Sequence, residues 1–368
     1  MRPLLLDNDL DALLVSDPVN RRYLSGFTGS SGWLIVSARR AILATDFRYV
    51  EQATREAPDF ELLRTTRNLR DWLSALLSEL GSRRLGFNPN SVTCAAHDAL
   101  VGAIQNTHPE TKLLPAAGLV EQLRSLKEPQ ELARITNAAH MVDAAFEHVA
   151  DLIQPGMTEC EAAWELERCL RELGSETIPF EIIVASGPNS ALPHARPTQR
   201  VIQPGEPVLI DMGARVEGYC SDFSRTVCCG TPDKTFRKLY GIVFQAQVAA
   251  IRGVRADSQA SDVDRIARDI IDKAGYGDAF GHSLGHGLGL APHESPTIGP
   301  SSADSLIDGM VFTVEPGIYL PGWGGVRIED TVVLQQGEAE VLTTSRKDAA
   351  SASLPNAGPS QGRRDPHI

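Results

Sequence analysis

Five side chains in the second half of the chain have the types and the spacing of a metal site: Asp211, Asp222, His286, Glu315 and Glu329. The carboxylates lie in or beside apolar runs, where burying an unpaired charge is costly. Oxygen and imidazole donors without a thiolate suit Mn²⁺, Co²⁺ or Zn²⁺, whereas structural zinc sites usually contain cysteine. Two pairs of carboxylates can bridge two such ions, an arrangement that activates water in many hydrolases. We therefore expect two divalent metal ions, manganese first and cobalt or zinc as alternatives, and hydrolytic chemistry.

The two aspartates lie on predicted strands that are joined by a short loop containing glycine, as in a β-hairpin. If the hairpin is symmetric about Val216 and Glu217, Asp211 and Asp222 face each other across the ladder. Like charges in directly opposed positions destabilise a sheet. A shared cation would remove that repulsion.

The two glutamates lie on a second predicted hairpin, whose loop is rich in proline and glycine. Symmetry about Gly322 places Glu315 opposite Glu329, with their Cβ atoms roughly 5 Å apart. This second opposed pair of acids again requires a common cation. A histidine motif lies between the two hairpins in the sequence and can supply the fifth ligand.

That motif is the glycine-rich segment 281–290, which contains His282 and His286. The two histidines are four residues apart and share a face, and the density of glycine argues against a helix. His286 can therefore bind metal while His282 reaches the substrate. The glycines follow a G-x-G-x-G pattern rather than G-x-G-x-x-G, and no ribose-binding acid follows in a βαβ context, so a dinucleotide site is not expected.

The chain has 368 residues, enough for two domains, and a formal net charge of −12 with acids and bases interspersed. Neither a basic stripe nor a basic amphipathic helix is apparent, so nucleic acid and membranes are not expected as partners. No apolar run has the length of a secretory signal core near the amino terminus or of a membrane span elsewhere. Six cysteines without C-x-x-C spacing suit a reducing compartment, and we expect a cytoplasmic protein.

Residues 1–120 alternate short apolar runs with helical patterns, which predicts an α/β domain. Residues 125–345 combine helices with the two ligand-bearing hairpins, which predicts an α+β catalytic domain. Residues 348–368 are rich in Ala, Ser, Pro and Gly, so a disordered tail is expected. In the first domain, strands are predicted at 12–15, 33–36 and 41–43, and a helix at 68–80 that Gly81 closes.

Three helices are predicted in the second domain. The first spans 129–153 and begins at a proline, which suits a first turn. Thr158 with Glu161 forms a capping box for a helix that ends before Gly174, and Ser261 with Asp264 repeats the signature for one that ends before Gly275.

The five ligands, together with the motifs Val-Glu-Pro-Gly around Glu315 and Gly-Gly-Val-Arg-Ile-Glu-Asp around Glu329, resemble the "pita-bread" metallopeptidases. The resemblance covers about residues 10–345. This superfamily includes methionine aminopeptidases, prolidases and aminopeptidase P. Residues 20–29 resemble the creatinase-type amino-terminal domain, which methionine aminopeptidases lack, so the proline-specific branch remains.

The resemblance assigns a role to each ligand. Asp211 would chelate one metal ion, Asp222 and Glu329 would bridge both ions, and His286 with Glu315 would bind the other. Hydrolysis would proceed by attack of a hydroxide held by the two metals. Glu315 would also act as general base or proton shuttle.

Four further residues are assigned by the same resemblance. His293 would stabilise the tetrahedral oxyanion, and His194 and His282 would contact the substrate in a pocket for proline. Arg327 neighbours the bridging glutamate, where its fixed guanidinium would hold carboxylates in place. A homodimer is also expected.

The proline-specific branch contains dipeptidases and aminopeptidases. Only one position in this sequence favours one of these activities over the other. Dipeptidases benefit from a cation that binds the free carboxylate of the terminal proline, and compact prolidases often have an arginine in the loop after the His293-like position. Residues 293–304 contain no Lys or Arg, and Thr297 occupies the expected place. We therefore expect an Xaa-Pro aminopeptidase that acts on peptides with proline at the second position, with Xaa-Pro dipeptidase as the alternative, although a basic group from a partner subunit could substitute.

Two remote alternatives share the fold. One is a creatinase-like amidinohydrolase that acts without metal, and the other is a non-catalytic pita-bread binding module. Both predict loss of the metal ligands, whereas this chain retains all five.

Overall fold

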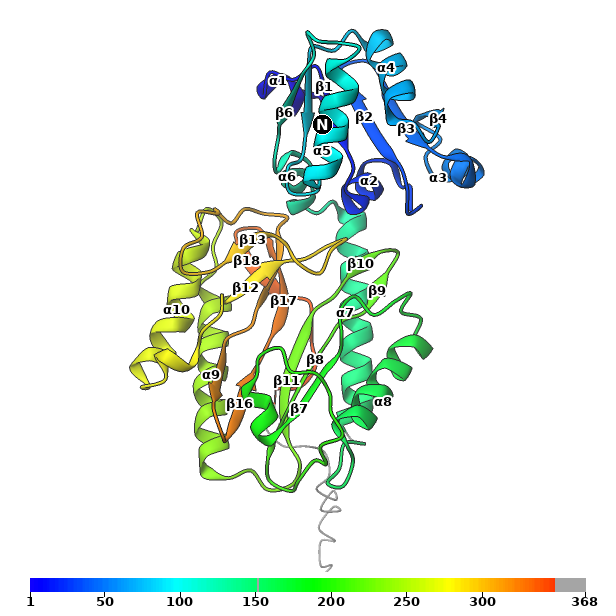
Figure 1. Ribbon diagram of the computed structural model, residues 1–368. Helices are drawn as coiled ribbons and strands as arrows, with labels where there is room; N and C mark the ends of the chain where they lie inside the picture. The colour runs from blue at the N-terminus through cyan, green and yellow to red at the C-terminus, as the bar shows by residue number, and fades with distance from the viewer. Residues whose placement is uncertain (151, 348–368) are drawn as a thin grey trace, which may run out of the picture. The chain divides into compact units, whose positions relative to one another are not determined.

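The computed structural model describes residues 1–150 and 152–347, so the predicted tail at 348–368 lies outside the described residues. The chain divides into two compact units, which are Met1–Arg124 and the residues from Ser125 on (Figure 1). Among the helices of the described part, none combines the length and the apolar character that crossing a membrane requires.

The first unit is built on a six-stranded mixed sheet in the order β4-β3-β2-β1-β5-β6. The strand β1 pairs antiparallel with β2 and parallel with β5, and all four of its residues are buried. Burial along the whole strand is typical of a sheet that is covered on both faces. The strands are β1 (Ala12–Val15), β2 (Trp33–Ser37), β3 (Ala41–Thr45), β4 (Glu61–Arg64), β5 (Arg84–Phe87) and β6 (Lys112–Pro115).

Helix α4 shows how local chemistry sets the element boundaries in this unit. The Asn68 side chain accepts a hydrogen bond from the backbone N–H of Arg70 at its start, and Gly81 ends it in the left-handed conformation with φ 61°. The three strands and the helix predicted here are confirmed, within two residues at their ends. The helices are α1 (Arg2–Asp7), α2 (Pro18–Ser25), α3 (Val50–Glu56), α4 (Leu69–Leu80), α5 (Cys94–Gln105) and α6 (Leu119–Ser125).

The second unit contains two sheets and two short ribbons. One sheet has the order β11-β8-β7, the other β13-β12-β14-β17-β18, and the ribbons are β9–β10 and β15–β16. The strands are β7 (Ile183–Ser186), β8 (Pro207–Met212), β9 (Arg215–Val216), β10 (Tyr219–Cys220), β11 (Phe223–Cys228), β12 (Gly285–Gly287), β13 (Glu294–Ile298), β14 (Val311–Val314), β15 (Gly317–Leu320), β16 (Gly324–Arg327), β17 (Asp330–Gln335) and β18 (Glu338–Val341).

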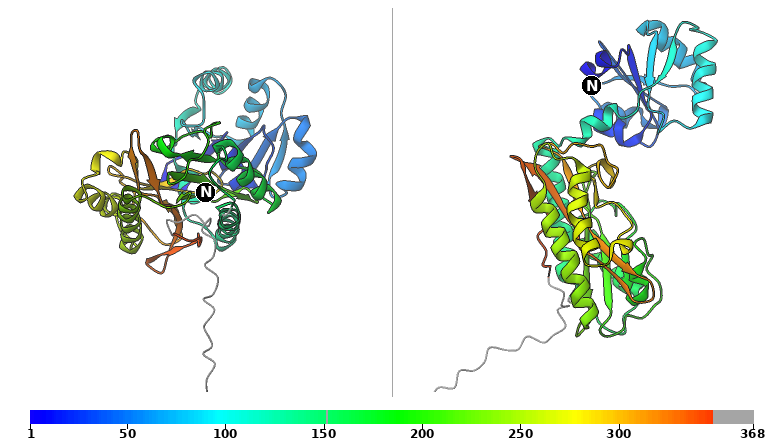
Figure 2. Two further views of the ribbon diagram at one scale, coloured as in Figure 1. Left: turned by 90° about the horizontal axis from the view of Figure 1, so that it is seen from below. Right: turned by 90° about the vertical axis from the view of Figure 1, so that its left-hand side faces the viewer.

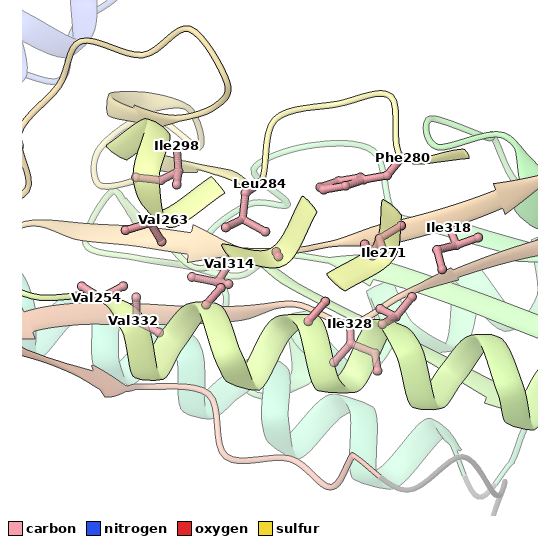
Figure 3. Packing of buried hydrophobic residues seen from close by; sticks show 14 of the residues in the cluster. Val254, Val263, Ile271, Phe280, Leu284, Ile298, Val314, Ile318, Ile328 and Val332 are labelled. Atoms are coloured by element: carbon pink, nitrogen blue, oxygen red, sulfur yellow. The ribbon is translucent and has the colours of Figure 1, made fainter. Parts of the chain in front are cut away.

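Two pairs of helices pack against these strands: α7 (Pro129–Ala150) with α8 (Glu159–Glu172), and α9 (Lys234–Gly253) with α10 (Ala260–Lys273). Figure 1 shows α7 and α8 beside β7 and β8, and α9 beside β16, and the views in Figure 2 show α9 running alongside the orange strands. Each pair closes its own apolar core. Residues of α9 and α10 form one core with the strands and their connections. Figure 3 shows part of this core, with Val263 and Ile271 of α10 among Val314, Ile318, Ile328 and Val332.

The predicted capping box at Thr158 and Glu161 is confirmed, because each side chain bonds the backbone N–H of the other residue. The second predicted box is wrong. Helix α10 begins at Ala260 without a side-chain cap, and Asp264 instead accepts hydrogen bonds from Arg268 and from the backbone N–H of Leu284. Asp264 therefore anchors the histidine-bearing segment rather than its own helix.

A buried polar network ties β11 and β17 to the end of the described chain. The Arg225 guanidinium donates to Asp330 Oδ1 at 2.9 Å and to the carbonyl oxygen of Ser345 at 3.1 Å, and both charged side chains are at most 1 % exposed. The same guanidinium donates to the carbonyl oxygen of Glu329. The network therefore fixes the backbone of a predicted metal ligand.

Replacing Arg225 by methionine should lower the free energy of unfolding by about 3–5 kcal/mol, because it removes one partner from a buried ion pair. Urea unfolding followed by circular dichroism measures the change. Arg168→Met is the matched control, since Arg168 forms ion pairs on the exposed face of α8 and its loss should cost under about 1 kcal/mol. Equal losses in the two variants would contradict the assigned importance of the buried network.

Candidate metal centre

The first hairpin places Asp211 and Asp222 two residues out of the predicted register. In the ladder between β8 and β11, Asp211 lies opposite Ser224, and the ribbon β9–β10 continues the same register. The turn is at Glu217 and Gly218, whose φ values of 47° and 88° match the positive angles of a type I′ turn. The expectation that Asp211 directly faces Asp222 is therefore wrong.

The two-residue shift nevertheless keeps both aspartates on one face, because side chains alternate with a period of two along a strand. Asp222 lies two residues before Ser224, so it is a diagonal neighbour of Asp211 rather than its direct partner. Diagonal neighbours across a ladder remain within reach of a common ion.

The second hairpin has the predicted register. Val314 pairs with Asp330 in the ladder of β14 and β17, and Gly317 pairs with Arg327 in the ribbon β15–β16. Glu315 and Glu329 occupy the opposed positions where the two ladders are interrupted. Both glutamates thus lie at a break in regular pairing, which frees them to turn toward the cavity.

His286 is the middle residue of the three-residue strand β12. The backbone of this strand lies very close to the backbone of β14. A Cβ atom on Gly285 would lie 2.0 Å from the carbonyl oxygen of Thr313, so this position needs glycine. The backbone N–H of His286 donates to Thr313 Oγ1 at 3.1 Å. Strand β14 therefore holds the backbone of His286 in place.

The ring of His286 presents a free lone pair to the carboxylates. Nδ1 donates to the carbonyl oxygen of Gly287 at 3.0 Å, and Nε2 lies 3.6 Å from Asp222 Oδ2 and 3.4 Å from Glu315 Oε1. Burial and the nearby His293 ring lower the pKa of His286 to about 4. The ring is thus neutral near pH 7, and these approaches are not ion pairs but donor atoms that converge on one point.

The carboxylates around that point are held close together against their repulsion. Burial, followed by the charges of neighbouring acids, raises the pKa values of Asp222 and Glu329 well above their ordinary values. Burial likewise raises the pKa of Glu315 to about 7. Ligand atoms of Asp222, His286 and Glu329 lie within 4.8 Å of one another. Among the described side chains, Asp211 Oδ1 is one of the few buried polar atoms that have no hydrogen-bond partner.

An unpartnered carboxylate oxygen, converging acids and a neutral imidazole are the donor set of a divalent cation. The residues present therefore fit divalent metal ions. Hydroxyl groups support this set from behind: Ser224 donates to Glu329 at 2.8 Å, and Thr313 donates to Glu315 at 3.2 Å.

Arg327 is the buried cation beside the acids. Its guanidinium donates to Ser224 Oγ at 3.0 Å, to the Tyr319 hydroxyl at 2.9 Å and to Asp211 Oδ2. It also donates to the carbonyl oxygen of Pro193 at 3.1 Å. Arg327 thus orients one ligand and holds the loop that carries His194.

All nine site residues that the sequence predicts line one cavity of about 760 Å³. The rings of His286 and His293 lie 4.1 Å apart, and His282 Nε2 lies 3.0 Å from the Tyr319 hydroxyl. Burial lowers the pKa of His282 to about 4. The geometry brings the residues together, while their individual roles stay predictions.

Ser224, Thr313 and Tyr319 were not among the predicted site residues, although the period of a strand indicates them. Ser224 lies two residues after a predicted ligand, Thr313 lies two before Glu315, and Tyr319 lies four after it. Even spacing places all of them on the same face as the ligands. The loop residues Glu181 and Arg196, which also line the cavity, follow no such period.

Comparisons with known proteins identify the family of each part of the chain. Residues 133–336 match the model of metallopeptidase family M24, and residues 1–126 match the creatinase/prolidase N-terminal domain. An uncharacterized peptidase of Bacillus subtilis, YqhT, is 39 % identical over 339 residues, which cover 92 % of this chain and 95 % of that protein. The predicted fold class, an α+β pita-bread domain after a smaller α/β creatinase-type domain, is confirmed.

Two solved structures are similar over nearly the whole chain. The Xaa-Pro dipeptidase from Bacillus anthracis is 40 % identical with a TM-score of 0.91, and the match covers 95 % of this chain and 97 % of that one. The X-Pro aminopeptidase from Thermotoga maritima is 36 % identical with a TM-score of 0.85, covering 92 % and 97 %.

The cluster of buried acids should make the unfolding free energy of the metal-free protein depend on pH. The folded chain keeps the Glu315 proton up to about pH 7, whereas the unfolded chain loses it near pH 4.5, so unfolding free energy should fall as pH rises through that window. Adding Mn²⁺ should raise the melting temperature more at pH 8 than at pH 5, because binding must displace protons at the lower pH.

Differential scanning fluorimetry of protein stripped with a chelator measures both effects. Glu315→Gln is the control, since it cannot ionise and should show a shallower fall in stability between pH 4.5 and 7. A wild-type protein whose stability rises over this window relative to the variant would refute the assignment.

Proposed function

We propose that this chain, which belongs to metallopeptidase family M24, is a metal-dependent Xaa-Pro dipeptidase. It would hydrolyse the bond between an amino-terminal residue and a terminal proline. The observation that carries the proposal is the similarity to the Bacillus anthracis Xaa-Pro dipeptidase, which extends over nearly the full length of both chains. The convergence of all nine predicted site residues on one cavity supports it.

The second candidate is the Xaa-Pro aminopeptidase that the sequence favours. Thr297, at the place where a carboxylate-binding arginine is expected, lines the cavity and supports this candidate, as does the similarity to the Thermotoga maritima enzyme. The dipeptidase similarity is stronger in identity, in coverage of this chain and in TM-score, so we rank the dipeptidase first. The two remote alternatives predict eroded ligand sets, and neither has such support.

Asp211, Asp222, His286, Glu315 and Glu329 would hold the divalent ions. When bound, such ions polarise a water molecule and the scissile carbonyl at neutral pH. We propose manganese as the native ion and a homodimer as the assembly. Elemental analysis and light scattering test these two expectations.

Glu315 would move the proton during hydrolysis. Burial places its pKa at about 7 in the metal-free chain, which is near the value that suits transfer in both directions. The carboxylate can accept a proton from the attacking water and deliver it to the departing proline nitrogen. The hydroxyl of Thr313, which donates to Glu315 Oε1, holds one oxygen of the carboxylate in position.

The histidines and Tyr319 would bind and orient the peptide. His293 is exposed at the cavity and would donate a hydrogen bond to the developing oxyanion. His282 is half-buried beside the rings of Phe280 and Tyr319, and burial lowers its pKa to about 4, so it can form one wall for the proline ring. His194 would complete this wall from the loop that Arg327 holds.

A substrate-length series discriminates between the two candidates. With Mn²⁺ or Co²⁺, Ala-Pro should be cleaved with a higher kcat/KM than Ala-Pro-Ala, because a dipeptidase site binds the free carboxylate of proline. Chromatographic detection of released alanine measures both rates, and Ala-Ala is the control for the requirement for proline. Faster cleavage of the tripeptide would identify the aminopeptidase instead.

His293→Gln should lower kcat on Ala-Pro by about 10²–10³-fold, which is the usual effect of removing an oxyanion donor. Metal content should not change, because His293 is not a predicted ligand. Steady-state kinetics together with elemental analysis of the variant test this. A variant with unchanged kcat would exclude the assigned role.

A further inference from the structure

An ion pair between Arg196 and Glu181 lies at the cavity and has no role in the proposed metal centre. Arg196 Nε lies 3.0 Å from Glu181 Oε2, and the two side chains are 80 % and 60 % exposed. Both residues line the cavity that contains the predicted ligands. The pair therefore faces the space that a bound peptide would enter.

The backbone that carries Arg196 is held firmly. Glu159 is fully buried and accepts hydrogen bonds from the backbone N–H groups of Ser186 at 2.7 Å and Thr198 at 3.0 Å. The hydroxyls of both residues donate to it as well. Arg327 fixes the loop between them through the carbonyl oxygen of Pro193. The loop is thus anchored at both ends and in its middle, while the guanidinium of Arg196 stays in solvent.

Arg196 also shares a side of this loop with a predicted substrate residue. Ala195 is buried against Ile183, Leu209 and Tyr319, whereas His194 and Arg196 on either side of it are exposed. Both flanking residues line the cavity. A group that contacts His194 is therefore near the reach of Arg196.

Among the cavity-lining residues that the structure describes, only two carry a permanent positive charge. Arg327 is buried and already donates to Ser224, Tyr319 and Asp211. Arg196 is the other, and its partner is an exposed acid. Of these two arginines, Arg196 is therefore the one that can exchange its ion-pair partner, Glu181, for an anionic group of a bound substrate.

The exchange is energetically easy. Exposed ion pairs contribute little to stability because water and salt screen them, so releasing Glu181 costs little. A guanidinium binds a carboxylate through two parallel N–H···O bonds, and such charge-assisted pairs are among the stronger hydrogen bonds. The rest of a bound substrate makes further contacts in the cavity. These contacts hold the substrate carboxylate near Arg196, so that it can displace Glu181.

We infer that Arg196 determines specificity by binding the free α-carboxylate of the substrate's proline, with Glu181 as its partner when no substrate is bound. The inference rests on the proposed dipeptidase function and names the residue that supplies the cation missing at Thr297. Glu181 competes with the substrate carboxylate for Arg196, so it keeps the guanidinium paired in the empty cavity and opposes proline binding slightly.

The binding test uses proline and prolinamide, which differ only in the carboxylate, on the metal-loaded protein in isothermal titration calorimetry. Wild type should bind proline at least tenfold more tightly than prolinamide. Arg196→Met should remove this difference, Arg196→Lys should keep part of it, and Glu181→Gln should keep or increase it. Arg265→Met, which breaks an exposed ion pair on α10, is the matched control and should behave as wild type.

The kinetic test compares Ala-Pro with Ala-Pro-amide. Arg196→Met should raise KM for Ala-Pro by about tenfold to a hundredfold with kcat nearly unchanged, and it should leave Ala-Pro-amide unaffected. A purely structural role would instead damage both substrates equally and lower the melting temperature.

The outcomes separate this inference from the proposed function. Equal losses on the acid and the amide, or a wild type that does not discriminate proline from prolinamide, would overturn the role of Arg196. Binding of proline that depends on Arg196, in a protein that cleaves no Xaa-Pro dipeptide, would refute the dipeptidase proposal and leave the role of Arg196 intact.

Discussion

Four carboxylates converge on one cavity, and their mutual repulsion is the constraint on which the second unit depends. Burial and the neighbouring acids shift Asp222 and Glu329 toward their protonated forms, so the metal-free cluster costs folding free energy. Arg327 contacts one of the acids directly, and two hydroxyl groups support others. The apolar cores under α7–α8 and α9–α10 must therefore supply the stability that this cluster removes.

The alternation of side chains along strands is what makes such a cluster possible. Ligands and supporting residues recur at even spacing: Ser224 follows Asp222 by two residues, and Arg327 precedes Glu329 by two. Each supporting group therefore leaves its segment on the same face as the neighbouring predicted ligand. It orients a predicted ligand of another segment, since Ser224 donates to Glu329 and Arg327 donates to Asp211. A single strand can thus supply both a donor to the ion and the hydrogen bond that fixes a neighbouring donor.

The convergence of the predicted ligands and the register of the second hairpin could be predicted because their signals are local and redundant. Glu315 and Glu329 lie in strongly apolar runs around a single glycine-rich loop, so only one symmetric register suits both. The first hairpin was less determined, since its turn requires Glu217, a residue other than glycine, at a positive φ. The error in register did not change the predicted site, because a shift of two residues leaves Asp211 and Asp222 on the same face of the sheet. The cap expected at Ser261 failed for a tertiary reason: Asp264 bonds Leu284, which is distant in sequence.

The cavity loop could not be predicted, and it is the part on which substrate choice depends. An Xaa-Pro dipeptidase and an Xaa-Pro aminopeptidase cleave the same bond, so a shared metal centre cannot distinguish their substrates. The substrates differ only beyond the proline ring, where one ends in a carboxylate and the other continues as an amide. A residue that distinguishes the carboxylate from the amide must be charged and held on a fixed backbone. It must also be only weakly paired when no substrate is bound. A strongly paired buried arginine such as Arg327 would lose several kcal/mol on exchange. Arg196 meets all three conditions, because its loop is anchored by Glu159 while its own partner is exposed.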